Sequence, residues 1–369
     1  MREMQTATII GAGAFGAWIA HALHQRGWSV TLVDQHGPAN SRASSGGETR
    51  IIRSGYGALS IYARWARESL AGWLALEQQI RQRIFARTGA LFLGGSEAWL
   101  RETEETLRLE RIPADLLSPA DLRRRYPQMR FESDAGAVFE PEAGVLFARR
   151  AVQALVGSLA REGVRVLTTH VDAKTLIEQS NDDALVFATG AWLPGMFPDV
   201  LRGFIVPTRQ EVFFFGPPPG DPAFSPAALP AWVAFDEGIY GLPDLEHRGA
   251  KVAVDAHGPP VDPKSLDRLV DPDAVARIRE LLRRRIPDLA DAPLLESRVC
   301  QYENTPDGHF LIDRLPGHDH VWIAGGGSGH GFKHGPAIGR YTAELIEGQR
   351  DLDALFALAG RPARQRRVY

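Results

Sequence analysis

Residues 6–34 read TATIIGAGAFGAWIAHALHQRGWSVTLVD: a β-branched run, a glycine-rich turn, an apolar stretch with helical spacing, and a short strand that ends on an acid. This order is the dinucleotide-binding fingerprint. Gly11 permits the tight turn, Gly13 lets the backbone approach a pyrophosphate, and Gly16 allows the helix to pack closely on the strand. Asp34 is expected to accept hydrogen bonds from an adenosine ribose. An acid there repels a 2′-phosphate, which disfavours NADP, whereas FAD and NAD both remain open.

The size and composition of the chain indicate an ordinary globular protein. Its 369 residues exceed what one hydrophobic core usually serves, so two linked domains are expected. A net charge of -3 gives no electrostatic reason to expect a nucleic-acid partner. No apolar run approaches 18 residues, so we expect neither a membrane span nor a membrane partner.

The chain has a single cysteine, Cys300. One cysteine cannot form an intramolecular disulfide, and no cysteine pair is available to hold a structural metal. We therefore expect no metal and a reducing, cytoplasmic location. A lone cysteine is by itself more typical of an inert, small hydrophobic residue.

The segment after the fingerprint, residues 41–57 (SRASSGGETRIIRSGYG), combines small hydroxyl residues and glycines with two arginines. Such a segment can turn backbone amides toward a phosphate or a flavin ring; the alternative is a solvated loop. Arg50 and Arg53 are three residues apart, which would place them on one side of a helical turn. Farther along, residues 183–190 form an apolar strand that ends in Thr-Gly, and this ending suits backbone close to a cofactor.

The remaining periodicity predicts alternating helices and strands, then a β-rich region. We expect helices at 61–80, 97–111, 148–163, 273–286 and 336–347, a helix start capped by Ser118, and strands at 89–95, 137–147 and 164–168. Within 137–147 we expect a turn at 141–144. Apolar runs at 211–216, 231–243 and 250–258, separated by Pro/Gly-rich turns, predict an antiparallel sheet that carries a substrate pocket.

Residues 300–333 read CQYENTPDGHFLIDRLPGHDHVWIAGGGSGHGFK. The segment contains the cysteine, a turn, two apolar runs, a glycine-rich loop and a lysine. Taken alone, it is compatible with two strands and a flexible loop.

Together with the fingerprint, with TRIIR (49–53) and with FATGAW (187–192), this segment resembles the monomeric sarcosine oxidase family of flavoproteins. That family includes N-methyltryptophan oxidase and belongs to the D-amino-acid oxidase-like superfamily. The resemblance implies an α/β chain of p-hydroxybenzoate hydroxylase-like architecture: a Rossmann-type FAD domain and a mainly antiparallel substrate domain. We expect residues 1–86, 145–205 and 301–369 to form the first domain, and residues 87–144 and 206–300 to form the second.

The resemblance also implies roles for individual residues. Cys300 matches the cysteine that carries the flavin through a thioether to its 8α carbon. Arg53 and Lys333 match the cations that bind the substrate carboxylate, and Arg50 matches an arginine against the flavin. Lys251 matches a lysine that assists reaction with oxygen; the alternative is an exposed lysine on an edge strand.

Three departures from the family concern the substrate. Ser44 to Gly47 stand where relatives have a histidine, Asp255 replaces a second histidine, and Ile239-Tyr240-Gly241 replaces a tyrosine pair. The stretch between 168 and 183 is also shortened. Carboxylate capture is therefore expected to be retained, while sarcosine itself is disfavoured as the substrate.

The expected catalytic residues are Lys251, Arg50 and Asp255, and the expected substrate-binding residues are Arg53, Lys333 and Tyr240. The expected cofactor-binding residues come from the fingerprint, the hydroxyl-rich segment, the strand ends and the C-terminal segment: Gly11, Gly13, Ala14, Gly16, Asp34, Gln35, Ser41, Ser44, Thr49, Arg50, Val171, Gly190, Trp192, Cys300, Gly327, Gly329, His330, Gly331 and Lys333. Backbone N–H groups of the 329–331 loop are expected to stabilise negative charge on the reduced flavin, and His330 is expected to be structural rather than a base.

The expected reaction is FAD-dependent oxidation of a secondary or cyclic α-amino acid to an imine, with oxygen reduced to hydrogen peroxide. One alternative is a dehydrogenase that passes electrons to a quinone or an electron-transfer protein. Another is a flavin-binding subunit of a larger complex. An NAD enzyme fits least well. We expect a monomer or a small homo-oligomer.

Overall fold

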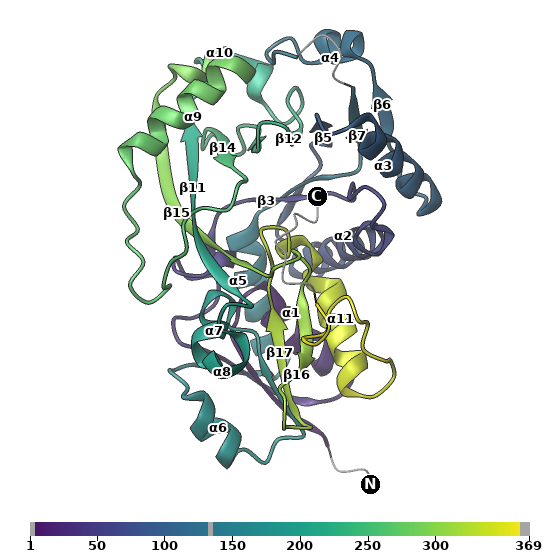
Figure 1. Ribbon diagram of the computed structural model, residues 1–369, viewed down its shortest axis with the longest axis vertical. Coiled ribbons are helices and arrows are strands. Elements are labelled where there is room, and N and C mark those ends of the chain that lie inside the picture. Colours follow the sequence, from purple (N-terminus) through teal and green to yellow (C-terminus); the bar gives the residue numbers. More distant parts are fainter. Residues whose placement is uncertain (1–3, 132–135, 362–369) are drawn as a thin grey trace.

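The computed structural model describes residues 4–131 and 136–361. Its first sheet has six strands in the order β16-β17-β10-β1-β2-β9. These strands are β1 (Thr6–Ile10), β2 (Ser29–Asp34), β9 (Arg165–Thr168), β10 (Ala184–Phe187), β16 (Leu311–Arg314) and β17 (Val321–Gly325). All neighbours are parallel except β16, which runs antiparallel to β17. The lower part of the molecule in Figure 1 is built on this sheet.

Helix α1 (Ala14–His24) follows β1 through the glycine turn. Gly11 has a φ of +106°, and a Cβ on it would lie 2.3 Å from the carbonyl oxygen of Ala188. A Cβ on Gly16 would lie 1.8 Å from the carbonyl oxygen of Gly11. Gly16 therefore has the packing role that the fingerprint predicts, because the helix can approach the turn only without a side chain at that position.

We expect Gly16→Ala to lower the free energy of unfolding by about 3 kcal/mol, because the added methyl group overlaps backbone that cannot move aside. Gly157→Ala is the matched control, since a Cβ on Gly157 would meet only the Arg161 side chain, at 3.6 Å. In a helix interior that change should raise stability by about 0.5–1 kcal/mol. Urea unfolding of both variants checks this pair, and equal effects would contradict the packing role of Gly16.

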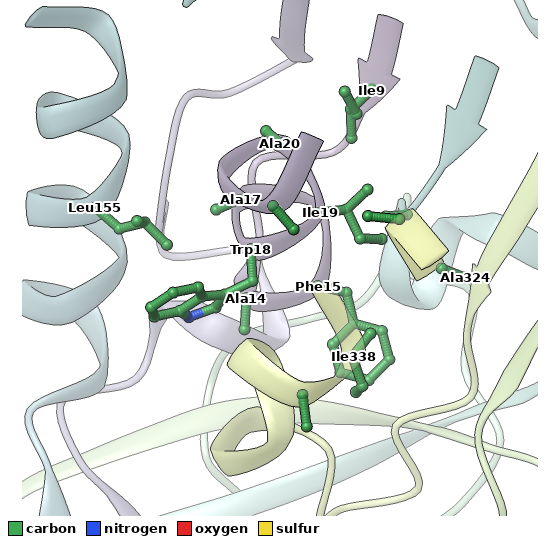
Figure 2. Packing of buried hydrophobic residues seen from close by; sticks show 14 of the residues in the cluster. Ile9, Ala14, Phe15, Ala17, Trp18, Ile19, Ala20, Leu155, Ala324 and Ile338 are labelled. Carbon is green, nitrogen blue, oxygen red and sulfur yellow. The ribbon is translucent and has the colours of Figure 1, made fainter. Parts of the chain in front are cut away.

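Helices α5 (Ala148–Arg161) and α11 (Gly335–Ile346) lie beside α1 in a shared apolar core. Figure 2 shows Phe15 pointing toward Ile338, while Trp18 lies toward the α5 side of the helix, near Leu155. A Cβ on Gly339 would lie 2.3 Å from the carbonyl oxygen of Trp18, so α1 and α11 also pack at close range. This core holds the N-terminus of α1 in place at the edge of the sheet.

The second sheet has eight strands in the order β15-β11-β14-β13-β12-β5-β7-β6. These strands are β5 (Ala90–Leu93), β6 (Asp115–Leu117), β7 (Ala137–Glu140), β11 (Val206–Phe215), β12 (Ala231–Ala234), β13 (Ile239–Leu242), β14 (Ala250–Val254) and β15 (Leu294–Asn304). The pairs are antiparallel except β12 with β5. The predicted antiparallel sheet is thus confirmed, with one parallel pair inside it.

Helices α9 (Pro272–Arg285) and α10 (Pro287–Ala290) cover this sheet (Figure 1). Ile278 and Leu282 of α9 pack in one cluster with Phe213, Phe215 and Trp232 of the strands. The long strands β11 and β15 pair along their whole length and extend toward the first sheet (Figure 1). They carry residues from the second sheet to the region where the two sheets meet.

A third, three-stranded sheet joins β3 (Arg50–Ile52), β8 (Gly144–Leu146) and β4 (Phe85–Ala86). One expectation was wrong here. Arg50 and Arg53 do not lie on a helical turn, because Ile51 pairs with Val145 in an antiparallel ladder. Residues 137–147 form two strands with a turn between them, as predicted. The two strands join different sheets, because β7 pairs with β5 and β6 while β8 pairs with β3 and β4.

The other helices are α2 (Ser60–Ile80), α3 (Glu97–Leu109), α4 (Pro119–Arg125), α6 (Ala173–Gln179), α7 (Leu193–Met196) and α8 (Pro198–Leu201). Ser118 caps α4 in a reciprocal capping box with Asp121, as predicted. The short connection between 168 and 183 contains α6. Among the described residues, no helix is long and apolar enough to cross a membrane. The proposed domain boundaries stay a prediction.

Candidate cofactor and substrate site

A large cavity opens at the carboxyl ends of β1, β2 and β10 and beside the loop after β17. Its empty volume, including the part open to solvent, is about 1430 Å³. Thirteen of the predicted cofactor residues line it: Gly11, Gly13, Ala14, Asp34, Gln35, Ser44, Arg50, Val171, Gly190, Trp192, Gly327, Gly329 and Gly331. We call this space the dinucleotide cavity.

Six predicted cofactor residues lie outside this lining. Gly16 serves helix packing, Ser41 is exposed, and Thr49 is buried below the cavity wall. Cys300, His330 and Lys333 line a second cavity instead.

The polar groups of the dinucleotide cavity fit a dinucleotide. Asp34 accepts N–H groups from Ala12 and His36, both at 2.9 Å, at the end of β2. The N-terminus of α1 points its amides into the same space, where negative phosphates are favoured. Two buried oxygen atoms here have no hydrogen-bond partner among the described residues: the hydroxyl oxygen of Ser44 and one carboxyl oxygen of Glu303. Buried polar atoms of this kind normally have partners, so a polar ligand is expected here.

The second cavity lies between the glycine-rich loop and the second sheet. It is lined by Arg50, Ile51, Arg53, Gln210, Glu211, Val212, Val233, Tyr240, Ala253, Val254, Asp255, Cys300, Tyr302, Gly329, His330, Phe332 and Lys333. Four of these residues, Arg50, Tyr302, Gly329 and Phe332, also line the dinucleotide cavity. The two cavities therefore adjoin, and we call this one the substrate cavity.

Two buried cations lie in the wall of the substrate cavity. The Arg53 guanidinium is 4.5 Å from the centre of the Tyr56 ring, and the Lys333 Nζ is 5.1 Å from the same ring. Lys333 donates to the carbonyl oxygen of His330 at 3.0 Å, and Arg53 donates to that of Gly55. Burial lowers the pKa of Lys333 well below its usual value, and Arg53 lowers it further. A bound carboxylate would stabilise the ammonium form, so this pair suits an anionic group.

Tyr56 joins the cations to a buried pair of histidines. Its hydroxyl is 3.1 Å from His330 Nδ1 and 3.0 Å from His334 Nε2. His330 Nε2 donates to the carbonyl oxygen of Gly308, and burial lowers the pKa of His330 well below its usual value, so the ring is neutral. His330 Nδ1 must then accept from Tyr56, and Tyr56 accepts from His334. With both ring nitrogens engaged, the arrangement favours the expected structural role of His330.

Cys300 lies on β15 opposite Gln210 of β11 and is half-buried. The Arg50 Nη2 is 3.6 Å from its Sγ and 2.6 Å from the carbonyl oxygen of Ser44. A second Arg50 nitrogen donates to the carbonyl oxygen of Thr49 at 2.7 Å. These bonds hold a fixed positive charge beside the only sulfhydryl, at the junction of the two cavities.

Lys251 lies on β14, between β11 and β13, and is 2% exposed. The alternative of an exposed edge-strand lysine was therefore wrong. Its Nζ donates to the carbonyl oxygen of Thr49 at 3.0 Å and does not line either cavity. Burial lowers the pKa of Lys251 well below its usual value, and Arg50 lowers it further. Through this bond, Lys251 supports the backbone next to Arg50.

Three more polar side chains line the substrate cavity: Tyr240, Asp255 and Tyr302. Tyr302 donates to Asp255 Oδ1 at 3.4 Å, and the Asp255 N–H donates to the carbonyl oxygen of Gly238 at 2.7 Å. Burial raises the pKa of Tyr240, and Asp255 raises it further, so the phenol is neutral. Asp255 thus adds an acid to the cavity that Arg53 and Lys333 also line.

The glycine-rich loop differs in one respect from the prediction. The N–H groups of His330 and Gly331 both donate to the carbonyl oxygen of Gly327, at 2.9 and 2.8 Å. The turn itself uses these two donors, so for residues 330 and 331 the expectation that the N–H groups stabilise the reduced flavin is wrong. For the N–H of Gly329, which lines both cavities, it stays a prediction.

Glu140 was missed in the sequence. It is 2% exposed at the end of β7, where it accepts the N–H groups of Ser54 and Gly55. It thereby holds the turn that positions Arg53. An acid that ends a strand gives no local signal of burial, since such positions are usually solvated.

Burial raises the pKa of Glu140 to about 7, against backbone hydrogen bonds that lower it. The unfolded chain releases this proton near its ordinary pKa of 4.5, whereas the folded chain keeps it until about 7. Stability should therefore fall as pH rises through this window, by about 3 kcal/mol in total. We expect urea unfolding of wild type, measured relative to Glu140→Gln, to show this loss between pH 4.5 and 7. In the exposed control Glu97→Gln, the free energy of unfolding should still fall with rising pH as it does in wild type. If it does not, Glu140 is not the cause of the fall.

Among the described residues, no group of three or more histidine, cysteine or acidic side chains is placed to hold a metal ion.

Comparison with known proteins agrees with this arrangement. Residues 6–345 match the family model described as FAD dependent oxidoreductase. The chain is 31% identical over 373 residues to monomeric sarcosine oxidase from Bacillus sp. strain B-0618, covering 96% of this chain and 95% of that one. It is 31% identical over 364 residues to mouse peroxisomal sarcosine oxidase, covering 92% and 91%.

Among solved structures, L-proline dehydrogenase from P. horikoshii has the same fold, with a TM-score of 0.79, 22% identity and 95% of each chain covered. The predicted fold class and the predicted resemblance are confirmed by these matches. Both the cavity and the matches point to the same cofactor class. The chain belongs to the FAD dependent oxidoreductase family, as a relative of sarcosine oxidase.

Proposed function

We propose that this protein oxidises a secondary or cyclic α-amino acid at its C–N bond, forming an imine and passing two electrons to oxygen. The observation that carries the proposal is the substrate cavity, which adjoins the dinucleotide cavity and is lined by Arg53, Lys333 and an acid, Asp255. Two cations and one acid in one small cavity match the carboxylate and the ammonium of an amino acid. The relatives named sarcosine oxidase support the same class of reaction.

FAD, when bound, supplies the two-electron acceptor, and the residues of the chain bind, orient and deprotonate the substrate. Arg53 and Lys333 hold the carboxylate, which fixes the carbon next to nitrogen at the junction of the cavities. Because both cations are buried and held by backbone carbonyls, they lose little freedom when the substrate binds.

Asp255 is the residue that interacts with the substrate amine. Its carboxylate binds the protonated amine and can accept the proton that must leave before oxidation, because only the neutral amine releases hydride equivalents. Tyr302, which donates to Asp255, and Tyr240, a neutral phenol, complete this wall. An acid here, and not a histidine, favours amines that enter as cations.

The overall reaction balances. The substrate loses two electrons and two protons as the C–N single bond becomes an imine, and oxygen takes up both to give hydrogen peroxide. Water then hydrolyses the imine. Arg50 brings a fixed positive charge to the junction, which favours the reduction of oxygen there. Lys251 donates to the same Thr49 carbonyl oxygen and supports the segment that carries Arg50.

The proposal is tested by measuring oxygen consumption and peroxide formation with a panel of N-methyl, cyclic and primary α-amino acids. We expect turnover with secondary or cyclic amino acids and one peroxide per oxygen. Turnover only with a quinone or another artificial acceptor would instead identify a dehydrogenase. Absence of turnover with every amino acid and acceptor would contradict the proposed function.

A further inference from the structure

The dinucleotide cavity contains a buried acid that the fingerprint does not explain. Glu303, near the end of β15, is 9% exposed and lines the cavity. Its Oε1 accepts the N–H of Gly327 at 3.3 Å. Its Oε2 is buried and has no partner among the described residues. A buried carboxyl oxygen without a partner is costly, so its presence in a ligand cavity points to a ligand atom as the partner.

The surroundings of Oε2 are shaped by glycines. A Cβ on Gly190 would lie 3.6 Å from Oε2, and a Cβ on Gly325 would lie 3.7 Å from it. The short helix η2 (Gly190–Trp192) begins at Gly190 and packs against β15. The absence of side chains at these positions leaves the carboxyl in contact with the space that the cofactor enters.

Few charges face Glu303. The helices η1 (Ser44–Gly46) and η2 pack against β15 and carry no titratable side chain. Its neighbour on β11 is Pro207. The loop after β17 contributes His330, which is neutral and has partners at both ring nitrogens. The other charged or titratable groups in the lining of the cavity include Asp34, His36, Arg50, His170 and Lys264, and within the described parts of the chain none of these five forms an ion pair with Glu303.

Burial raises the pKa of Glu303 to about 7, and the backbone N–H groups of Gly327 and Gly326 only partly oppose this. Binding of FAD would displace water from the cavity and bring two phosphate charges into it. Both changes disfavour an ionised carboxyl further.

We propose that Glu303 binds FAD as a neutral acid, with its Oε2–H donating a hydrogen bond to an acceptor atom of the cofactor, so that FAD binding takes up one proton from solvent. The neutral form supplies the donor that the carboxylate lacks. This proposal rests on FAD binding and not on the amino-acid substrate.

Isothermal titration of full-length Cys300→Ala apoprotein with FAD, in two buffers of different ionisation enthalpy, measures this proton. The Cys300 change keeps FAD binding reversible. At pH 8 we expect uptake approaching one proton, and above neutral pH the FAD Kd should rise by up to about tenfold per pH unit. Adding Glu303→Gln should abolish the uptake and flatten the pH dependence while FAD still binds, because the glutamine amide can donate from the same place. Adding Glu178→Gln, at an exposed site on α6, should change neither.

If the Glu303→Gln protein does not fold, Glu303→Asp serves instead and should bind FAD more weakly with proton uptake retained. Equal proton uptake with and without Glu303→Gln would overturn the proposal. A Kd that falls as pH rises would also overturn it, since that result means that FAD binding releases a proton and does not take one up. A protein that binds FAD with proton uptake but oxidises no amino acid would leave this proposal intact and remove only the proposed function.

Discussion

Replacing Lys333 by alanine is expected to lower kcat/KM for α-amino acids by about 100-fold or more, since losing one partner of a buried, hydrogen-bonded charge pair costs about 3 kcal/mol. Most of the loss should appear in KM, because Lys333 binds the carboxylate and not the reacting atoms. The same change at Lys174, whose side chain is 84% exposed on α6, is the matched control and should have no effect. Steady-state kinetics of both variants check this. Unchanged KM in Lys333→Ala would contradict the carboxylate role.

The same lysine predicts a pH dependence. Burial and Arg53 both lower the pKa of Lys333, so the free enzyme loses this positive charge at a lower pH than an exposed lysine does. KM should therefore rise as pH rises through that pKa, because the neutral amine no longer attracts a carboxylate. In Lys333→Arg, where the cation cannot lose its proton, this rise should be absent.

Replacing Cys300 by alanine is expected to turn a protein that keeps its flavin in acid into one that releases nearly all of it. Cys300 is the only cysteine, lies at the junction of the two cavities, and has the Arg50 guanidinium 3.6 Å from its sulfur. A thioether from this position is the covalent link that the resemblance implies. Acid precipitation, with the yellow colour divided between pellet and supernatant, measures the effect.

In wild type, we also expect the mass of the peptide that contains residue 300 to be increased by the mass of FAD. Colour in the wild-type supernatant, with an unmodified peptide, would contradict the covalent link. That result would leave FAD binding itself unaffected, because the dinucleotide cavity does not depend on Cys300 for its lining.

The fingerprint predicted the fold around β1 and α1 because its glycines have local, steric causes. Gly11 and Gly16 both meet backbone at less than 2.4 Å if a Cβ is added, so no other residue fits there. The expectation for Arg50 and Arg53 failed for the opposite reason. Strand β3 forms by pairing with β8, where Ile51 lies opposite Val145, almost a hundred residues later. The spacing between Arg50 and Arg53 gives no information about that distant partner.

The candidate site shows the same contrast. Arg53, Cys300 and Lys333 line one cavity, as the resemblance implied, although they lie far apart in the chain. Glu140 and Glu303 were missed, because in sequence each is an acid near the end of a strand and resembles a solvated position. Their burial comes from elements distant in the chain, namely the turn at residues 54–55 and the glycine loop after β17.

In the proposed mechanism, a carboxylate held by Arg53 and Lys333 brings the amine to the flavin. Anaerobic mixing tests it directly, with loss of the flavin absorbance as the readout. We predict that a secondary or cyclic α-amino acid bleaches the wild-type protein, while the same amine without its carboxyl group does so far more slowly. In Lys333→Ala the difference between the two compounds should shrink. Equal bleaching by both compounds in wild type would contradict the role of Arg53 and Lys333 in holding the carboxylate.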